Sequence, residues 1–179
     1  MNFLELSSNT YEVMNITSEL PICCAFPLLH GNDPHTLILG TFPSPLSREK
    51  EEYYGNPRNQ FWKLIFGVFG EPFENPGYGK KKSVLFANKI ALCDVIIKCK
   101  PDGALDSGIH DPVYNTKLPE FIAELGISKI LFNGNNAYQF YRRGIGEIER
   151  CVLPSSSPAN ASKRFDEKLQ LWQDALLKK

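Results

Sequence analysis

The sequence has few of the residues that build metal centres, and none of them in the usual spacing. It contains three histidines and five cysteines, and no two cysteines stand in the C-x-x-C spacing of zinc and iron–sulfur sites. No histidine lies in a metal-binding pattern, so we expect neither a metal ion nor another cofactor. Because the number of cysteines is odd, we expect reduced, mostly buried thiols, as in a cytoplasmic protein.

Patterns that would place the chain in a membrane, outside the cell or in a common enzyme class are also missing. No apolar run approaches the ~20 residues that span a bilayer. The N-terminal segment carries Glu5 and Glu12 and no basic stretch before an apolar core, so we expect no secretory signal and no membrane partner. No Ser-His-Asp signature, P-loop or G-x-G-x-x-G after a strand occurs.

Charge of one sign is not in excess. The 20 Lys and Arg residues balance 20 Asp and Glu residues, so the formal net charge is zero. Such a chain has no general attraction to nucleic acid, and any binding of that kind requires a local basic patch. The basic residues near the loops discussed below are Arg58, Arg142, Arg143, Lys163 and Arg164.

What remains is the composition of an ordinary folded domain. The chain has 179 residues, of which 42% are hydrophobic and 22% charged, as expected for one globular unit. We expect residues 35–179 to form that single domain. Residues 1–34 lack clear periodicity, and we expect an N-terminal arm whose segment Cys23–Phe26 packs against the body.

Short apolar runs alternate with amphipathic patterns along the rest of the chain. Runs such as "HTLILG" and "KILFN" are typical of buried strands, and apolar residues three and four positions apart predict helices. Strands that alternate with helices favour an α/β fold with a mainly parallel sheet covered on both faces. The expected strands are 35–40, 90–95, 129–133 and 149–153, and the expected helices are 60–69, 119–125, 134–142 and 162–177.

Four polar or proline-containing segments follow the expected strands at their carboxyl ends. In open parallel sheets, ligands bind beyond these ends. We therefore expect a site where the four segments meet, at Gly40–Ser44, Cys93–Asp94, Asn133–Gly134 and Pro154–Asn160.

Two asparagines in the loops each allow a structural and a functional interpretation. Asn59 precedes Gln60-Phe61-Trp62, where its side chain is suited to cap a helix. The alternative is an amide that positions a water or reads a base. Asn133 stands in an Asn-Gly pair typical of a turn. The alternative is an amide that points into the cleft, where it can donate and accept at once.

Aromatic and hydroxyl side chains accompany these asparagines. Phe42, Tyr53 and Tyr54 are core residues by default, but Phe42 stands between a strand end and a proline, where its ring is suited to stack on a base. The two tyrosines are suited to wall the same pocket. Ser155–Pro158 is either a turn or a set of donors to phosphate. A pocket with few obvious acids favours a reaction whose leaving group is already good.

Six motifs occur in an order that resembles one group of DNA repair enzymes. Together they are similar to the hypoxanthine (deoxyinosine) DNA glycosylases, a branch of the uracil-DNA glycosylase superfamily, over roughly residues 35–179. The mismatch-specific uracil/thymine DNA glycosylases are similar in outline. The motifs are "LILGTFPS", "YYGNPRNQFW", "IALCDVI", "GALDSGI", "ILFNGNNA" and "VLPSSSPANA".

The resemblance implies a three-layer α/β/α sandwich with a short, mainly parallel sheet, and a metal-free, monofunctional N-glycosylase. The catalytically important asparagines of the branch match Asn59 and Asn133. Phe42 stands where the mismatch-specific enzymes carry a catalytic asparagine, which favours the deoxyinosine branch over strong uracil excision. The chain departs from the branch at Asn56, usually histidine, and at Cys93, often tryptophan.

The resemblance also implies a substrate: DNA with deaminated bases, chiefly hypoxanthine, removed by a monomer in base excision repair. The nucleotide is flipped out and the N-glycosidic bond breaks through an oxocarbenium-like sugar. The alternatives are uracil or xanthine excision, and a non-catalytic nucleic-acid-binding module of the same fold.

Roles within the site follow as expectations. Asn59 orients the water or contacts the sugar, Asn133 hydrogen-bonds the base, and Ala159 or Asn160 fills the vacated stack. Backbone N–H groups of the first loop face developing negative charge. The expected site comprises catalytic Asn59 and Asn133; base-binding Gly40, Thr41, Phe42, Pro43, Ser44, Tyr53 and Tyr54; and DNA-binding Arg58, Ser155, Ser156, Ser157, Pro158, Ala159, Asn160 and Lys163.

Overall fold

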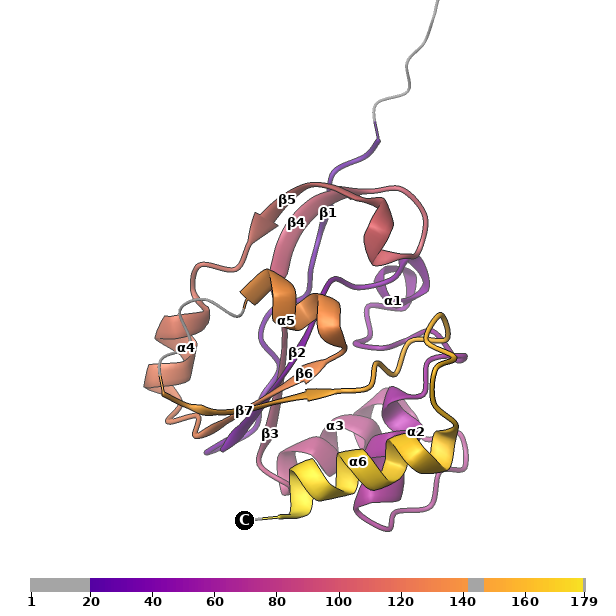
Figure 1. Ribbon diagram of the computed structural model, residues 1–179, viewed down its shortest axis with the longest axis vertical. Coiled ribbons are helices and arrows are strands. Elements are labelled where there is room, and N and C mark those ends of the chain that lie inside the picture. Colours follow the sequence, from indigo (N-terminus) through magenta and orange to yellow (C-terminus); the bar gives the residue numbers. More distant parts are fainter. Residues whose placement is uncertain (1–19, 142–146, 179) are drawn as a thin grey trace, which may run out of the picture.

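The computed structural model describes residues 20–141 and 147–178, and its centre is a parallel sheet of four short strands (Figure 1). Thr36 lies opposite Ile90 and Lys129, and Asn133 lies opposite Leu153, so the strands end at one common edge. The strand order is β3 (Ile90–Asp94), β2 (Thr36–Gly40), β6 (Lys129–Asn133) and β7 (Glu149–Leu153).

Apolar layers cover both faces of this sheet. In β2, Leu37 and Leu39 face one layer and Ile38 faces the other, as the two-residue period of a strand requires. β3 is buried along its whole length. Strands that are buried on both faces are apolar at nearly every position, which is why the runs in the sequence do not alternate with polar residues.

The helices form two groups, one on each face of the sheet (Figure 1). α4 and α5 contribute to the layer of Leu37 and Leu39, and α2, α3 and α6 contribute to the layer of Ile38. The predicted α/β/α sandwich with a parallel central sheet is therefore confirmed. The bounds are α2 (Phe61–Val68), α3 (Tyr78–Ala87), α4 (Leu118–Glu124), α5 (Asn135–Tyr141) and α6 (Phe165–Leu177).

A small antiparallel sheet, which the sequence patterns did not indicate, continues the chain from β3. A single residue, Val95, separates β3 from the middle strand of this sheet, β4. The loop between the strands β4 and β5 is closed by the Asp102 N–H, which donates to the Gly108 carbonyl at 2.7 Å. The strands, in spatial order, are β1 (Cys23–Cys24), β4 (Ile96–Pro101) and β5 (Ile109–Tyr114), with a 3-10 turn η1 (Asp106–Gly108) before β5.

The predicted elements of the parallel core occur close to their expected places. β6 and β7 coincide with the expected strands. The last helix begins at Phe165 instead of residue 162, because the Ser162 N–H donates to Asn160 Oδ1 at 3.1 Å and forms a turn. A short helix, α1 (Pro45–Lys50), was not expected. Its N-terminus is capped by Ser44, whose Oγ accepts from the backbone N–H of Ser47.

Residues 20–34 run along the body. The Ala25 N–H donates to the Ile97 carbonyl at 2.9 Å, and Leu29 and Leu92 exchange two backbone hydrogen bonds. Residues 1–19 of the expected arm lie outside the described residues, so the boundary at residue 34 stays a prediction. Within the described ranges, no helix is both long enough and apolar enough to cross a membrane.

The expectation of mostly buried thiols is wrong. Cys93 and Cys99 are buried, but Cys24 and Cys151 are exposed and Cys23 is half-buried. All five cysteines are free.

Candidate active site

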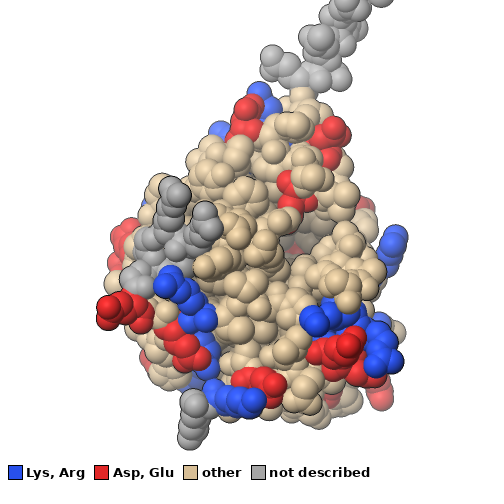
Figure 2. All heavy atoms as spheres, viewed as in Figure 1, with Lys and Arg blue, Asp and Glu red and all other residues tan. Residues whose placement is uncertain are grey.

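An open cavity of about 500 Å³ lies at the carboxyl ends of the parallel strands, where the loops after β2, β3, β6 and β7 meet. The face seen in Figure 2 is hollowed between the strand ends and the last loop. The volume is within the range of cavities that bind small molecules and single nucleotides. The position agrees with the site expected from the strand ends.

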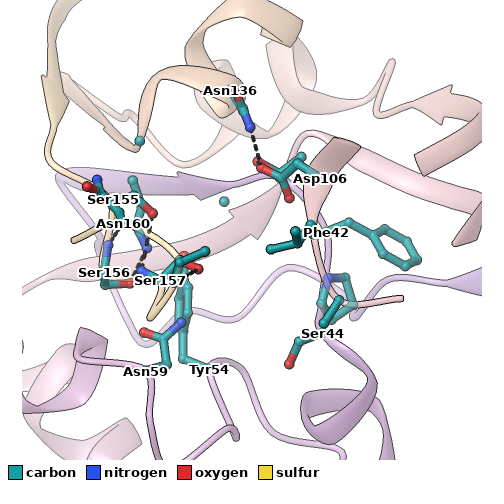
Figure 3. Close-up of a pocket in the computed structure, with 18 of the residues that line it drawn as sticks. Phe42, Ser44, Tyr54, Asn59, Asp106, Asn136, Ser155, Ser156, Ser157 and Asn160 are labelled. Carbon is teal, nitrogen blue, oxygen red and sulfur yellow. Dashed lines mark hydrogen bonds between the residues drawn. The ribbon is translucent and has the colours of Figure 1, made fainter. Parts of the chain in front are cut away.

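The cavity brings together most of the predicted residues. The cavity is lined by both asparagines, by the loop after β2 (Gly40–Ser44, the first loop) and by most of the loop after β7 (Pro154–Asn160, the last loop) (Figure 3). The predicted residues among its lining are Gly40, Thr41, Phe42, Pro43, Ser44, Tyr53, Tyr54, Asn59, Asn133, Ser155, Ser156, Ser157, Ala159 and Asn160.

Three predicted residues do not line this cavity. Arg58 is exposed next to Asn59 along the chain. Pro158 and Lys163 line a smaller neighbouring hollow of about 300 Å³. The candidate basic residues Arg142 and Arg143 lie outside the described residues.

Asn59 uses one end of its amide in a structural hydrogen bond and leaves the other end free. Its Oδ1 accepts from the backbone N–H of Phe61 at 2.9 Å, which satisfies a donor at the start of α2. No described group accepts from its Nδ2, and the side chain lines the cavity (Figure 3). Asn59 therefore offers a ligand the N–H donors of its Nδ2, and its oxygen keeps one further lone pair.

Asn133 is held at both ends of its amide by one neighbour. Its Nδ2 donates to Ser156 Oγ at 2.8 Å, and the Ser156 backbone N–H donates to its Oδ1 at 2.8 Å. Asn133 is 8% exposed and Ser156 is fully buried, so Ser156 stands behind Asn133 and not at the surface where a phosphate would lie. One N–H and one oxygen lone pair of the Asn133 amide remain for a ligand.

Gly134 lets the loops after β6 and β7 approach each other. Its φ is +101°, a conformation that residues with a Cβ rarely adopt. A Cβ at this position would lie 2.9 Å from the Ser155 Cβ. The Asn-Gly pair is therefore a turn, as one interpretation predicted, and it also carries a side chain that lines the cavity.

An aromatic wall borders the cavity beside Asn59. The Tyr54 ring stacks on the buried Phe61 ring, with centroids 3.8 Å apart and planes inclined by 16°. The Tyr54 backbone has φ +53°, which is uncommon for an aromatic residue and typical of strained positions at functional sites. Gly40 lies against this ring, because a Cβ at Gly40 would be 2.9 Å from Tyr54 Oη.

The other two predicted rings are used mainly in packing. Tyr53 is buried and donates its hydroxyl proton to the Pro27 carbonyl at 3.1 Å. Phe42 packs against the core, and the Arg48 guanidinium lies 5.6 Å from its ring centroid. Figure 3 shows the Phe42 ring on the side of the cavity away from Asn59 and Tyr54. The ring beside the catalytic candidates is therefore that of Tyr54.

Two carboxyl groups are among the residues that line the cavity. Asp94 ends β3, is 4% exposed, and its Oδ2 has no hydrogen-bond partner among the described residues. Burial, and to a lesser extent the charge of Asp106, raises the pKa of Asp94 to about 7. Its place at a strand end was noted in the sequence, but nothing there indicated its burial.

Asp106, in η1, is the second carboxylate that sequence reasoning missed. Its Oδ2 accepts from Thr41 Oγ1 at 3.0 Å and from Asn136 Nδ2 at 2.9 Å (Figure 3). The donors come from the loop after β2 and from α5, so one carboxylate joins three segments of the cavity wall. The motif "GALDSGI" that contains it was the only signal in the sequence.

The last loop is folded by its own hydroxyl groups. Ser155 Oγ accepts from the Ser157 N–H at 3.2 Å, and Ser157 Oγ accepts from the Ala159 N–H at 3.3 Å. A hydroxyl that accepts a hydrogen bond still has its own proton to donate. The loop therefore presents O–H donors along the rim of the cavity.

A buried lysine joins this loop to the start of α2. Lys168 of α6 is 1% exposed, and its Nζ donates to Gln60 Oε1 at 3.0 Å and to the Asn160 carbonyl at 2.8 Å. Burial lowers the pKa of this amine. Lys168 lines the smaller hollow of about 300 Å³ together with Lys163 and Arg164. Figure 2 shows Lys and Arg side chains near the N-terminal end of α6.

Comparisons with known proteins point to one family. The family model described as "Uracil DNA glycosylase superfamily" matches residues 28–176. A curated protein of Methanosarcina acetivorans, named Hypoxanthine DNA glycosylase, is 38% identical over 86% of this chain and 96% of its own length. A protein of the same name from Methanosarcina barkeri is 35% identical over 75% of this chain and 86% of its own length.

A solved structure has the same fold. The solution NMR structure of a Methanosarcina acetivorans protein classed with the uracil DNA glycosylases superposes with a TM-score of 0.75 at 34% identity. The superposition covers 87% of this chain and 97% of that protein.

Proposed function

We propose, because this chain belongs to the uracil DNA glycosylase superfamily, that it is a monofunctional DNA glycosylase of base excision repair that removes hypoxanthine. The names of its relatives support hypoxanthine as the main base. The observation that carries the proposal is the cavity at the strand ends, where Asn59 and Asn133 both keep amide groups free for a ligand.

The fixed amide of Asn133 supports a deaminated base over adenine. The Ser156 backbone N–H can only donate, so it determines which end of the Asn133 amide is the oxygen. The amide therefore offers its N–H and its lone pair in one order only. Hypoxanthine presents an N–H donor and a carbonyl acceptor side by side, whereas adenine presents them in the reverse sense. We assign the Asn133 amide to the hypoxanthine edge.

The reaction requires the nucleotide to leave the duplex, since a stacked base cannot enter the cavity. Hypoxanthine pairs poorly with thymine, which lowers the energy needed to flip it out. As the glycosidic bond breaks, negative charge develops on the base and positive charge on the sugar. Asn59 Nδ2 and the backbone N–H groups of the Thr41–Ser44 loop are donors suited to the departing base.

The DNA strand is held by the rim of the cavity. Ser155 and Ser157 offer hydroxyl protons to phosphate oxygens, and Lys163 and Arg58 supply positive charge beside them. Ala159 is exposed at the tip of the last loop and is placed to follow the flipped base into the vacated stack. The chain acts as a monomer in this scheme.

Single-turnover excision tests the proposal. Duplexes with one deoxyinosine, uracil or xanthine are incubated with the protein in EDTA and then treated with alkali, which cleaves the strand where a base has been removed. We expect cleavage chiefly at deoxyinosine. Asn59→Ala and Asn133→Ala each reduce the rate by about 100-fold or more, because each removes a donor to developing charge.

Asn32→Ala, which changes an exposed asparagine away from the cavity, is the matched control and keeps the full rate. Cleavage chiefly at uracil or xanthine would mean that the chain catalyses the same reaction on a different base. Binding to every duplex without any cleavage would support a binding module instead. Full activity in both cavity variants would refute the assignment of the asparagines.

A further inference from the structure

The two asparagines of the cavity leave one part of the reaction without a residue. When water attacks the sugar, one of its protons must pass to an acceptor. The Asn59 oxygen already accepts from the Phe61 N–H, and the Asn133 oxygen from the Ser156 N–H, so each keeps only one lone pair. A neutral amide oxygen is also a very weak base. The acceptor must therefore be another group of the cavity, if the proposed function is correct.

The cavity contains two carboxyl groups, and they differ in how they are held. Asp94 is buried under the cavity, and the raised pKa of its side chain leaves a large neutral fraction near pH 7. Asp106 is half-exposed, and no Lys, Arg or His among the described residues forms an ion pair with it. Asp106 is therefore the carboxylate that is both reachable and free of a cationic partner.

The hydrogen bonds of Asp106 orient it toward the ligand. Both donors, Thr41 Oγ1 and Asn136 Nδ2, bind the same oxygen, Oδ2. No described group donates to Oδ1. The turn is itself fixed, because the Gly108 N–H donates to the Leu105 carbonyl at 3.0 Å. One oxygen anchors the side chain and the other keeps its lone pairs for a ligand.

The place of Asp106 in the cavity fits the geometry of glycoside hydrolysis. Figure 3 shows Asp106 across the cavity from Asn59 and Tyr54. Its charge reaches the cavity interior, since it contributes to the raised pKa of both Asp94 and Tyr54. In an inverting hydrolysis, the leaving group and the water act on opposite faces of the sugar. Donors on one wall and a carboxylate on the other match this arrangement.

We propose that Asp106 is a catalytic residue, the carboxylate that holds the attacking water and accepts its proton. The lone pair of the water oxygen forms the bond to the sugar C1′. One water proton passes to Asp106 Oδ1, and the electron pair of the glycosidic bond leaves with the base. The base anion then takes a proton from solvent, and Asp106 returns its own proton to solvent. A negative charge at this position also stabilises the oxocarbenium-like sugar.

A purely structural role for Asp106 makes different predictions. If the carboxylate only joins three segments of the cavity wall, removal of one anchoring hydrogen bond should lower the excision rate as much as removal of the negative charge. Asp106→Asn keeps an acceptor oxygen for the anchors but loses the charge. Asn136→Ala removes an anchor but keeps the charge. The ratio of the two effects separates catalysis from positioning.

The test uses single-turnover excision from a deoxyinosine duplex, with DNA binding measured separately on a duplex whose 2′-fluorinated deoxyinosine resists hydrolysis. We expect Asp106→Asn to lose about 100-fold or more in rate, the usual contribution of a general base, with affinity changed by less than about threefold. Asn136→Ala should lose only about threefold to tenfold. Asp102→Asn, which neutralises an exposed acid of the same loop, is the matched control and keeps the full rate.

Chemical rescue gives a second measurement, which would show no effect if the role of Asp106 were purely structural. In Asp106→Ala, added formate should restore part of the rate in proportion to its concentration, because it supplies a carboxylate where the side chain was. Formate should not stimulate the unaltered protein or Asn136→Ala. Equal losses in Asp106→Asn and Asn136→Ala, or no rescue in Asp106→Ala, would overturn the proposal while the unaltered protein still excises hypoxanthine. An inactive unaltered protein would instead overturn the proposed function.

Discussion

At the scale of single residues, the cavity depends on a glycine that leaves room for two polar groups. A Cβ on Gly40 would meet the Asp94 carboxyl group and would lie 2.9 Å from Tyr54 Oη. Neither group can move away, because Asp94 is buried and the Tyr54 ring is stacked on Phe61. We expect Gly40→Ala to lower the free energy of unfolding by about 1–3 kcal/mol and the excision rate by about 10-fold or more.

Urea unfolding and single-turnover kinetics measure both effects. Gly79→Ala is the control, because a Cβ at Gly79 meets nothing within 4 Å. Alanine in the first turn of α3 should stabilise the protein by about 0.5–1 kcal/mol and leave the rate unchanged. A Gly40→Ala variant as stable and active as the unaltered protein would show that Asp94 and Tyr54 have room to rearrange.

The sequence supported residue assignments where the chemistry was local. A role for Asn59 at the start of a helix was recognisable because the residues that follow it begin an apolar helical pattern, and the structure shows its bond to the Phe61 N–H, although Gln60 is the N-cap of α2. Asp106 was not recognisable, because its partner Thr41 is 65 positions away. Phe42 was assigned to the cavity from its place in a loop, and it does line the cavity, but its ring also packs against the core. Contacts between distant segments decided these outcomes, and no local pattern encodes them.

At the scale of elements, Lys168 connects α6 to both the start of α2 and the last loop. Its Nζ bonds Gln60, the neighbour of Asn59, and the Asn160 carbonyl. The amine has no carboxylate partner within residues 20–141 and 147–178, and burial lowers its pKa. Lys168→Met keeps much of the apolar stem and removes both bonds. We expect about a 10-fold loss of excision rate, because the segment that carries Asn59 is no longer held to the loop.

Thermal stability should change little in Lys168→Met, because loss of a buried charge offsets the loss of its hydrogen bonds. Calorimetry and single-turnover kinetics test the two parts separately. Lys63→Met, at an exposed position of α2, is the matched control for charge and should leave the rate unchanged. A full rate in Lys168→Met would mean that the backbone bond from the Gln60 N–H to the Ser156 carbonyl, at 2.9 Å, is sufficient to hold the two segments together.

The elements that were predicted correctly share a physical cause. β2 and β6 have continuous apolar residues because the layers on each side bury them, and α2 and α6 have periodic ones because one face of each packs against the core. The β4–β5 hairpin was missed because its register shifts between Ile96 and Lys98 and again between Lys98 and Lys100. Such irregularities interrupt the alternation by which a strand is recognised. The missed hairpin is also the element that brings Asp106 to the cavity.

At the scale of the whole molecule, the buried Asp94 makes stability depend on pH. The carboxyl group has a pKa of 3.8 in its ordinary state and about 7 in the folded protein. The folded state therefore keeps a proton that the unfolded chain releases between pH 4 and pH 7. The contribution of this group to stability is complete below about pH 4, is lost progressively as the pH rises, and changes no further well above 7.

The charged and titratable groups around Asp94 add little to this dependence. Cys93 has its pKa raised to about 12 by burial and by Asp94, and burial also raises the pKa of Tyr53 and Tyr54 well beyond the usual value. All three stay neutral across the window. Asp106 is the remaining charged neighbour, and its effect enters through the raised pKa of Asp94 itself.

Replacement of Asp94 by asparagine, which has nearly the same shape and no titration, should remove this pH dependence. We expect Asp94→Asn to become more stable relative to the unaltered protein as the pH rises from 4 to 7, by at most ~4 kcal/mol, with a constant difference above that range. Urea unfolding at a series of pH values measures the difference, and Asp102→Asn, at an exposed position, is the control that should show almost none. A difference between Asp94→Asn and the unaltered protein that stays flat from pH 4 to pH 7 would mean that Asp94 ionises in the folded state at its ordinary pKa. A water-filled cavity that solvates the carboxylate would then replace burial as the physical description of this site.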